Sequence, residues 1–227
     1  MISKTGCKNA GSNSGKEINT TAPNSIGTED YEGLIREAIR TQLRCPICGV
    51  LDDLEFEHLS QLQYQVLHHD SVSRSIVLSA GFCAFHFRRF RKIATSQTSA
   101  RLLHDLCEAW ASNSLPSNSD CVLCSANAHH ENFLVEALVG LLREDRFRQT
   151  FEESIGLCLA HHRSVESGTK NEKLIHFLRE TQQKQFKRLS DNLHTLGSKR
   201  FFDASKQERA AEPDAIEKFV GRKALGA

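Results

Sequence analysis

The chain has few of the features that mark several large protein classes. Its 227 residues include one methionine, one tryptophan, two tyrosines and four prolines. No apolar run approaches the roughly eighteen residues that a membrane-spanning helix requires, so we expect no membrane segment. The first residues lack the apolar stretch of a secretory signal, and we therefore expect a cytoplasmic protein. The formal net charge of +1 excludes a polycation that coats nucleic acid.

Catalytic and nucleotide-binding signatures are also absent from the sequence. It contains no G-x-x-x-x-G-K-[ST] phosphate loop, no G-x-G-x-x-G dinucleotide motif and no nucleophile elbow. Four acidic residues do gather early in a predicted helix: Asp52, Asp53, Glu55 and Glu57. Acidic residues at such positions complement the helix dipole and need no catalytic role. The sequence therefore favours a non-catalytic protein over an enzyme.

Cysteine is the reactive residue type that the sequence has in quantity. There are eight cysteines, and in a reducing cytoplasm such residues are metal ligands or buried thiols more often than disulfides. Six of them form an ordered pattern with two histidines: Cys45, Cys48, Cys83, His86, Cys121, Cys124, Cys158 and His161. The pattern is C-x2-C followed by G-x-C-x2-H, and it occurs twice. Cys107 lies on an apolar helical face instead, and we expect it to be buried.

The two occurrences of the pattern indicate a tandem duplication. Cys45 aligns with Cys121 at an offset of 76, and Gly81 aligns with Gly156 at an offset of 75. Such repeats are identified before a fold is predicted, because each copy is one structural unit.

Apolar residues outside the motifs recur at helical spacing, and strand-like alternation is nearly absent. The sequence therefore predicts an all-α fold built from a tandem duplicated helical repeat. We expect a disordered tail at 1–27, a first metal-binding repeat with flanking helices at 28–112, a second repeat at 113–170, and a C-terminal helix and tail that pack on the repeats at 171–227.

Each copy supplies three thiolates and one imidazole, which together complete a tetrahedral zinc site. The turn in C-x2-C directs both sulfurs to one point, and in C-x2-H the residues i and i+3 share one face of a helix. The preceding glycine permits a positive φ where the chain enters that helix. We therefore predict two Zn²⁺ ions, each stapling one repeat through its own Cys3His site. Iron–sulfur clusters are the alternative, because cysteine and histidine also bind iron.

The motifs "CPIC…GFCAFH…CVLC…GLCLAHH" resemble an uncharacterised family of bacterial and archaeal proteins with a duplicated CPxC…GxCxxH frame and a helical C-terminal tail. The likeness covers roughly Asp30 to Val220. It implies a helical metal-binding fold in which the same eight cysteine and histidine residues are the ligands, and it implies no activity. The second copy departs from the frame at Val122, where the first copy has Pro46.

Three further histidines each have two possible roles. His58 and His130 fall on the apolar faces of the two corresponding helices. They either form a second metal or proton-handling site between the repeats or are core histidines, and we expect core histidines. His162 is an alternative ligand to its neighbour His161, and we prefer His161.

The segment His86–Lys92 carries four cations on one helix, with Phe87 and Phe90 between them. Such a patch contacts nucleic acid or an acidic partner in some proteins. The second copy has only HHRSVES at this place, with the single cation Arg163, so the patch is not repeated and we expect a solvated helix face.

A four-ligand site leaves no position for water or substrate, which argues against a hydrolytic zinc enzyme. The predicted function is that of a zinc-binding helical protein that acts through protein–protein contacts, as an adaptor or regulatory factor with an unknown protein partner. The alternatives are a redox or metal-handling accessory protein with iron–sulfur or thiolate-bound metal, and a nucleic-acid-binding zinc protein.

Overall fold

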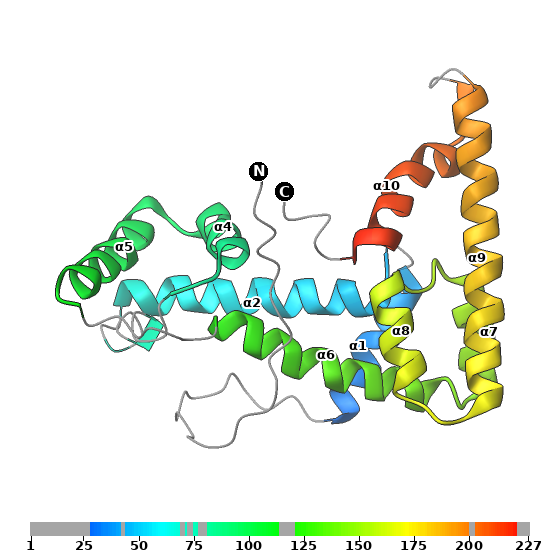
Figure 1. Cartoon of the computed structure of the whole chain (residues 1–227), viewed down its shortest axis with the longest axis horizontal. Helices are drawn as coiled ribbons and strands as arrows, with labels where there is room; N and C mark the ends of the chain where they lie inside the picture. The colour runs from blue at the N-terminus through cyan, green and yellow to red at the C-terminus, as the bar shows by residue number, and fades with distance from the viewer. Residues whose placement is uncertain are drawn as a thin grey trace.

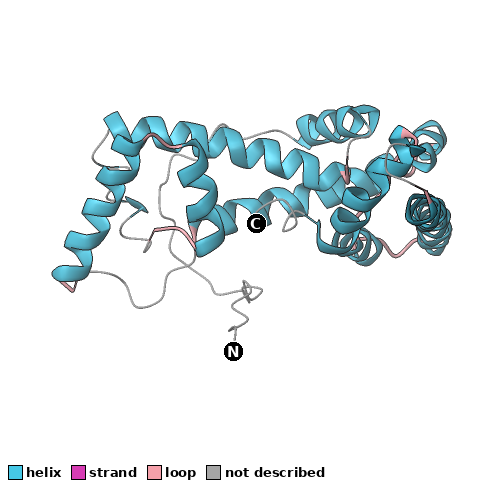
Figure 2. Cartoon of the chain, turned by 90° about the horizontal axis from the view of Figure 1, so that it is seen from above, coloured by secondary structure: helices cyan, strands magenta, loops and turns pink. Residues whose placement is uncertain are grey.

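The structure is a computed structural model that describes residues 28–41, 44–68, 71, 75–76, 81–113, 121–199 and 203–221. These residues contain nine labelled helices and no strand, so the predicted all-α class is confirmed (Figure 2). The tail predicted to be disordered at 1–27 lies outside the described residues. Within the described ranges, every helix is too short or too polar to cross a membrane.

Two long helices form the axis of the molecule. Helix α2 spans Pro46–His68 and helix α6 spans Val122–Leu141. They pack side by side and run in opposite directions (Figure 1). Each helix begins one residue after the first cysteine of a C-x2-C pair, so the two pairs lie toward opposite ends of the helix pair. Helix α1 (Thr28–Thr41) packs against both.

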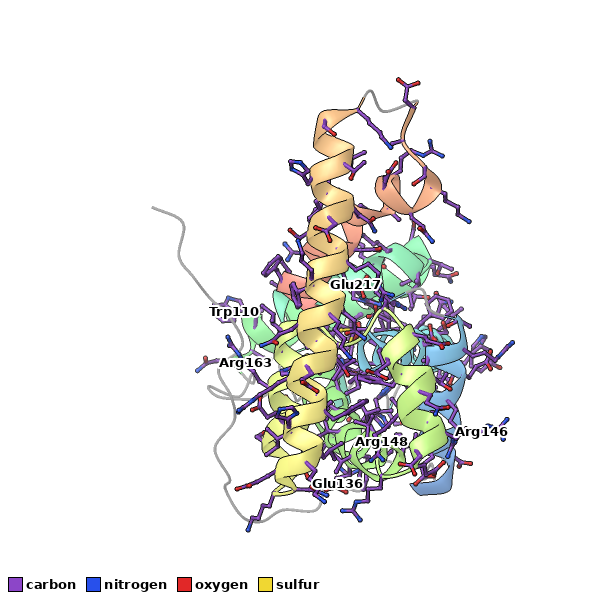
Figure 3. The ribbon with its side chains drawn as sticks, turned by 90° about the vertical axis from the view of Figure 1, so that its right-hand side faces the viewer. Trp110, Glu136, Arg146, Arg148, Arg163 and Glu217 are labelled. Atoms are coloured by element: carbon purple, nitrogen blue, oxygen red, sulfur yellow. The ribbon has the colours of Figure 1, made fainter. Side chains whose placement is uncertain are left out.

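The larger core lies where α1, α6 and the start of α2 meet α7 (Asp145–Glu153), α8 (Leu159–Ser167) and α9 (Glu172–Ser198). Its centre is formed by side chains with almost no exposed surface, among them Ile35, Ile47, Leu134, Leu138, Phe151, Leu157 and Val165. Helix α9 stands across this end of the molecule and faces the viewer in Figure 3. This core takes helices from both predicted repeats, and the repeat boundaries themselves stay a prediction.

The smaller core lies where the second half of α2 meets α4 (Ala84–Ile93) and α5 (Ser96–Ala111). Helix α5 buries only a narrow face, formed by Thr98, Leu102 and Ala109. Cys107 is exposed, so the expectation that it is buried is wrong. Leu103 and Trp110, which are apolar residues of the same helix, are also exposed.

A further helix, α10 (Lys206–Val220), follows α9 and was not predicted as a separate element. Ser205 and Glu208 form a capping box at its start, in which each side chain accepts a hydrogen bond from the other residue's backbone N–H. The helix folds back to pack on α9 and α8 (Figures 1 and 3).

Candidate metal centres

The eight predicted ligands lie in two groups of four, and each group draws on both copies of the motif. Site A contains Cys45, Cys48, Cys158 and His161, and site B contains Cys83, His86, Cys121 and Cys124. The prediction that each repeat holds its own Cys3His site is therefore wrong. The C-x2-C pair of one copy faces the C-x2-H pair of the other.

The length and direction of the two axial helices explain this exchange. A helix of 23 residues, such as α2, is about 35 Å long. The end of α2 is therefore far from Cys45, and Cys83 follows that end by fifteen residues. Because α6 runs antiparallel to α2, its first turn lies beside the second half of α2, where Cys83 meets Cys121. The far end of α6 likewise delivers the chain that carries Cys158 to the start of α2.

Site A is compact and closed. The Sγ atoms of Cys48 and Cys158 are 3.7 Å apart. His161 directs Nδ1 toward all three sulfurs, at 3.4 Å from Cys45 and 3.3 Å from both Cys48 and Cys158. All four side chains are buried.

Site B has the same geometry with more exposure. The Sγ atoms of Cys83 and Cys124 are 3.7 Å apart. His86 places Nδ1 3.3 Å from Cys83 and Cys121 and 3.4 Å from Cys124. His86 is buried, whereas the three cysteines are half-buried.

Both groups fit a single tetrahedral ion. Zinc bonds of about 2.3 Å to sulfur and 2.0–2.1 Å to nitrogen correspond, across a tetrahedron, to S–S separations of about 3.8 Å and S–N separations of about 3.6 Å. The shortest distances found are within a few tenths of an ångström of these values. They are far from the roughly 2.05 Å of a disulfide, and every cysteine in the described part of the chain is free.

The glycines before both C-x2-H pairs have the backbone conformation that the sequence predicts. Gly81 has a φ of 75° and Gly156 a φ of 78°, in the region that glycine adopts without steric cost. Each lets the chain turn sharply into a helix whose N-cap is a cysteine, Cys83 for α4 and Cys158 for α8. The histidine three residues later then lies in the first helical turn.

The ring nitrogen that faces away from each site contacts a glutamate. Nε2 of His86 lies 3.4 Å from Oε2 of Glu55, and Nε2 of His161 lies 3.3 Å from Oε1 of Glu131. Glu55 is fully buried and also binds Nε of Arg89 at 2.7 Å, so it is more than an early-helix acid that complements the dipole. Both glutamates could have been found in the sequence, because each C-x2-C extends to C-x2-C-x6-E.

Each group of ligand side chains holds positive and negative charge together. Burial acts to lower the pKa of His161, but hydrogen bonds with Cys158, Cys45 and Glu131 outweigh it and raise the pKa to about 12. Burial also acts to lower the pKa of His86, but hydrogen bonds with Cys121 and Glu55 outweigh it and raise the pKa to about 10. Burial acts to raise the pKa of Cys121, whereas its hydrogen bond with His86 helps to lower the pKa to about 6. The lowered pKa of Cys121 favours the thiolate form, which is the form that binds a cation.

The end of α10 covers site A. A Cβ atom on Gly221 would lie 3.4 Å from Sγ of Cys158 and 3.9 Å from Sγ of Cys48. Lys218 is 4% exposed and donates a hydrogen bond to the carbonyl of Leu157 at 3.3 Å. Burial lowers the pKa of Lys218 to about 8, and the Cys45 and Cys158 thiolates oppose that shift. A buried cation therefore lies beside the sulfurs of this site.

The other histidines of the described residues lie outside both groups. Nδ1 of His130 lies 2.7 Å from the hydroxyl of Tyr31, and burial lowers the pKa of both His58 and His130. Both side chains are half-buried, and neither belongs to a metal-binding group of the described residues, so their role as core histidines stays a prediction. His162 contacts Glu166 at 3.8 Å instead of the site.

The basic segment on α4 is only partly solvated. Arg88, Arg91 and Lys92 are exposed, as expected for a solvated face. Arg89 turns inward and forms ion pairs with Asp52 at 3.1 Å and Glu55 at 2.7 Å. The four cations therefore do not form one continuous surface for nucleic acid.

No family model, curated protein or solved structure matches the chain. The resemblance to the family with the duplicated CPxC…GxCxxH frame accordingly stays a prediction.

Proposed function

We propose that the protein is a non-catalytic zinc-binding protein whose two Cys3His sites hold its helices together. The observation that carries the proposal is the closeness of the ligand atoms, which lie within 4.8 Å of one another in each group. Three thiolates and one imidazole complete the shell of a structural zinc ion. A shell of that kind has no open position for a water nucleophile or a substrate.

The spacing of the ligand atoms favours one ion per site over an iron–sulfur cluster. A cluster binds its cysteines through different iron atoms with sulfides between them. Its ligands must therefore spread farther apart than the ligands of one ion. Sulfur atoms 3.7 Å apart in both groups suit the single ion, and zinc is a frequent occupant of such a shell.

Stapling by metal matches the topology of the chain. Site A joins residues that are 110 positions apart, and site B joins residues 41 positions apart within that span. Structural zinc contributes about 10–16 kcal/mol of apparent binding energy per site in small peptides. That is comparable to the whole stability of a typical domain, about 5–15 kcal/mol. Thiolates bind metal only while reduced, so the proposal includes a reducing compartment such as the cytoplasm.

With its metal sites turned inward, such a protein acts through its outer surface. Large apolar side chains are exposed on that surface, including Phe56 at 55%, Tyr64 at 62%, Trp110 at 77% and Phe219 at 63%. Exposed aromatic side chains of this kind are enriched where proteins bind one another. We therefore propose a role as an adaptor or regulatory factor that contacts an unknown protein partner.

The half-buried thiols of site B favour one second candidate, a metal-handling accessory protein. Thiolates react and exchange ligands in proportion to their exposure. Cys83, Cys121 and Cys124 are all half-buried, whereas the cysteines of site A are buried. Under this candidate function, site B would transfer its ion while site A keeps the fold.

Elemental analysis of protein purified without oxygen, together with its absorption spectrum, tests the proposal. We expect two zinc ions per chain and no absorption in the visible range. Iron with sulfide and visible charge-transfer bands would replace the zinc proposal by the iron–sulfur alternative. Rapid transfer of one zinc per chain to a weak chelator, with helicity retained, would favour the metal-handling role over a purely structural one.

A further inference from the structure

We propose that Glu55 and Glu131 are positioning residues that link the two metal sites to each other. Each glutamate belongs to the helix whose cysteines bind one ion and orients the histidine that binds the other ion. The inference rests on the proposed function, because it assigns a role toward ions bound at sites A and B.

The spacing of the residues places each glutamate on a defined face of its helix. Glu55 follows Cys48 by seven residues, and Glu131 follows Cys124 by seven residues. Seven residues are about two helical turns and about 10 Å of rise, so each carboxylate lies on the same helix face as the second cysteine, two turns further along. A carboxylate two turns away is too distant to contact the ion bound by its own C-x2-C pair.

The antiparallel packing of α2 and α6 brings each carboxylate to the opposite site. Helix α2 starts at site A, and its Glu55 lies 3.4 Å from Nε2 of His86 in site B. Helix α6 starts at site B, and its Glu131 lies 3.3 Å from Nε2 of His161 in site A. The side-chain amide of Asn127 donates a hydrogen bond to Oε2 of Glu55 at 2.8 Å and so helps to hold that carboxylate at site B.

A carboxylate at this place fixes the state of the imidazole. It accepts the Nε2 proton, holds that tautomer and leaves the lone pair of Nδ1 directed at the sulfurs, where the ion would bind. It also fixes the plane of the ring and increases the basicity of Nδ1. Loss of such a partner typically costs 10- to 100-fold in metal affinity.

The crossed arrangement makes occupancy of one site affect the other. An ion in site B fixes the first turn of α6 and therefore the position of Glu131, which prepares His161 for an ion in site A. Glu55 has the corresponding effect on site B when site A is filled. Linkage of this kind is reciprocal, so each ion raises the affinity for the other by the same factor.

Glu131 is the better residue to test, because its surroundings tolerate a change. Its side chain is 40% exposed, whereas that of Glu55 has no exposed surface and also pairs with Arg89. The variant Glu131→Gln keeps the size of the side chain and removes its charge. Glu136→Gln is the matched control, because Glu136 is exposed on the same helix (Figure 3).

The affinity of each site can be measured separately by alkylation. The protein is equilibrated in a series of chelator-buffered zinc concentrations, alkylated briefly and digested, and the protection of each cysteine is read by mass spectrometry. The exposed Cys107 gives the unprotected reference. We expect Glu131→Gln to lower the zinc affinity of site A about tenfold, with the helicity of the fully loaded protein unchanged and Glu136→Gln like the wild type. Unchanged site A affinity in Glu131→Gln would overturn the proposal.

A double-mutant cycle tests the link itself. Cys124→Ser removes a ligand of site B and should lower the zinc affinity of site A. The factor by which it lowers that affinity should be smaller when Glu131→Gln is already present. If Cys124→Ser lowered the affinity by the same factor in the wild type and in Glu131→Gln, the link would not pass through Glu131 and the proposal would be overturned. If Cys124→Ser does not fold, the loading series decides: both sites should fill over one narrow zinc range in the wild type and over separated ranges in Glu131→Gln. Superimposed ranges in Glu131→Gln would refute the link, whereas absence of bound metal in the wild type would refute the proposed function instead.

Discussion

Sites A and B have the same ligand set and nearly the same internal distances, yet their surroundings differ. Site A is buried in the larger core, with the end of α10 against its sulfurs. Site B lies beside the smaller core, and its three cysteines are half-buried. The ligand set determines which ion each site can hold. The packing around it determines how much of the fold depends on that ion and how readily the ion leaves.

The order of the ligands along the chain adds to this difference. Site B lies inside the span that site A closes, so α4 and α5 can loosen without releasing the ends of that span. Loss of site A would instead free the start of α2 from α8, and these two elements belong to the larger core. We therefore expect the two sites to contribute unequally to stability.

The largest expected effect is the loss of a ligand from site A. Cys158→Ala should release one metal ion and lower the free energy of unfolding by more than about 4 kcal/mol, because a buried site is lost together with its staple. Cys83→Ala should also release one ion, with a smaller loss that is confined to α4 and α5. Metal analysis measures the released ion, chemical denaturation measures the loss of stability, and hydrogen exchange shows whether the loss is confined to α4 and α5.

Cys107→Ala is the control for these variants, because Cys107 is exposed and outside both sites. It should retain both ions and change stability by less than about 0.5 kcal/mol. Equal destabilisation by Cys158→Ala and Cys83→Ala would contradict the unequal roles of the sites. Unchanged metal content in either variant would remove that cysteine from the ligand set.

The second prediction compares the two glycines that precede the C-x2-H pairs. At Gly156 an added Cβ would overlap the side-chain amide of Gln185, which donates to the carbonyls of Phe151 and Ser154. At Gly81 the nearest atoms are the methyl groups of Leu106 at 3.4 Å. Gly156→Ala should therefore cost about 3 kcal/mol or more, from the positive φ and the displaced amide together.

Gly81→Ala carries only the strain of the positive φ and should cost about 1–2 kcal/mol. Thermal or chemical denaturation of the zinc-loaded variants gives both values. A cost at Gly81 as large as the cost at Gly156 would show that backbone strain dominates and that the packing of Gln185 is not what separates the two turns.

The sequence predicts the helices and the eight cysteine and histidine residues that come together in the two groups, because both depend on local spacing. Helical periodicity is visible in any single segment, and the positive φ of Gly81 and Gly156 follows from their place before a helix. The capping residues Ser205 and Glu208 are an equally local signal for the start of α10. Local patterns of this kind need no knowledge of the tertiary structure.

The pairing of the ligands could not be predicted in that way. Whether Cys45 shares an ion with Cys83 or with Cys158 depends on the length of α2 and on the direction in which α6 packs against it. The prediction that Cys107 is buried is wrong for a related reason. The way in which α5 packs against α2 decides which of its side chains are covered. Both depend on tertiary packing, which a repeated motif does not encode by itself.

The third prediction concerns the reactivity of the thiols. In zinc-loaded protein, a thiol-reactive disulfide in excess should modify Cys83, Cys121 and Cys124 before the cysteines of site A, because exposure limits attack on a bound thiolate. Mass spectrometry of timed samples gives the order, and a zinc-responsive dye should register two phases of metal release. Simultaneous modification of all six cysteines would mean that the protein opens as a whole before either site reacts.

The most local effect is expected at the cover of site A. Gly221 has a φ of 66°, and an added Cβ would lie 3.4 Å from Sγ of Cys158, so Gly221→Ala should weaken the seating of α10 at a cost of about 1–2 kcal/mol. The site A thiols should then react faster, closer to the rate of site B, with two ions still bound per chain. Gly197→Ala is the control, because its Cβ would meet no atom within 4 Å in helix α9, and it should leave the order of reaction unchanged. If Gly221→Ala reacts like the wild type, α10 does not protect site A, and the burial of its sulfurs within the larger core must account for the difference between the two sites.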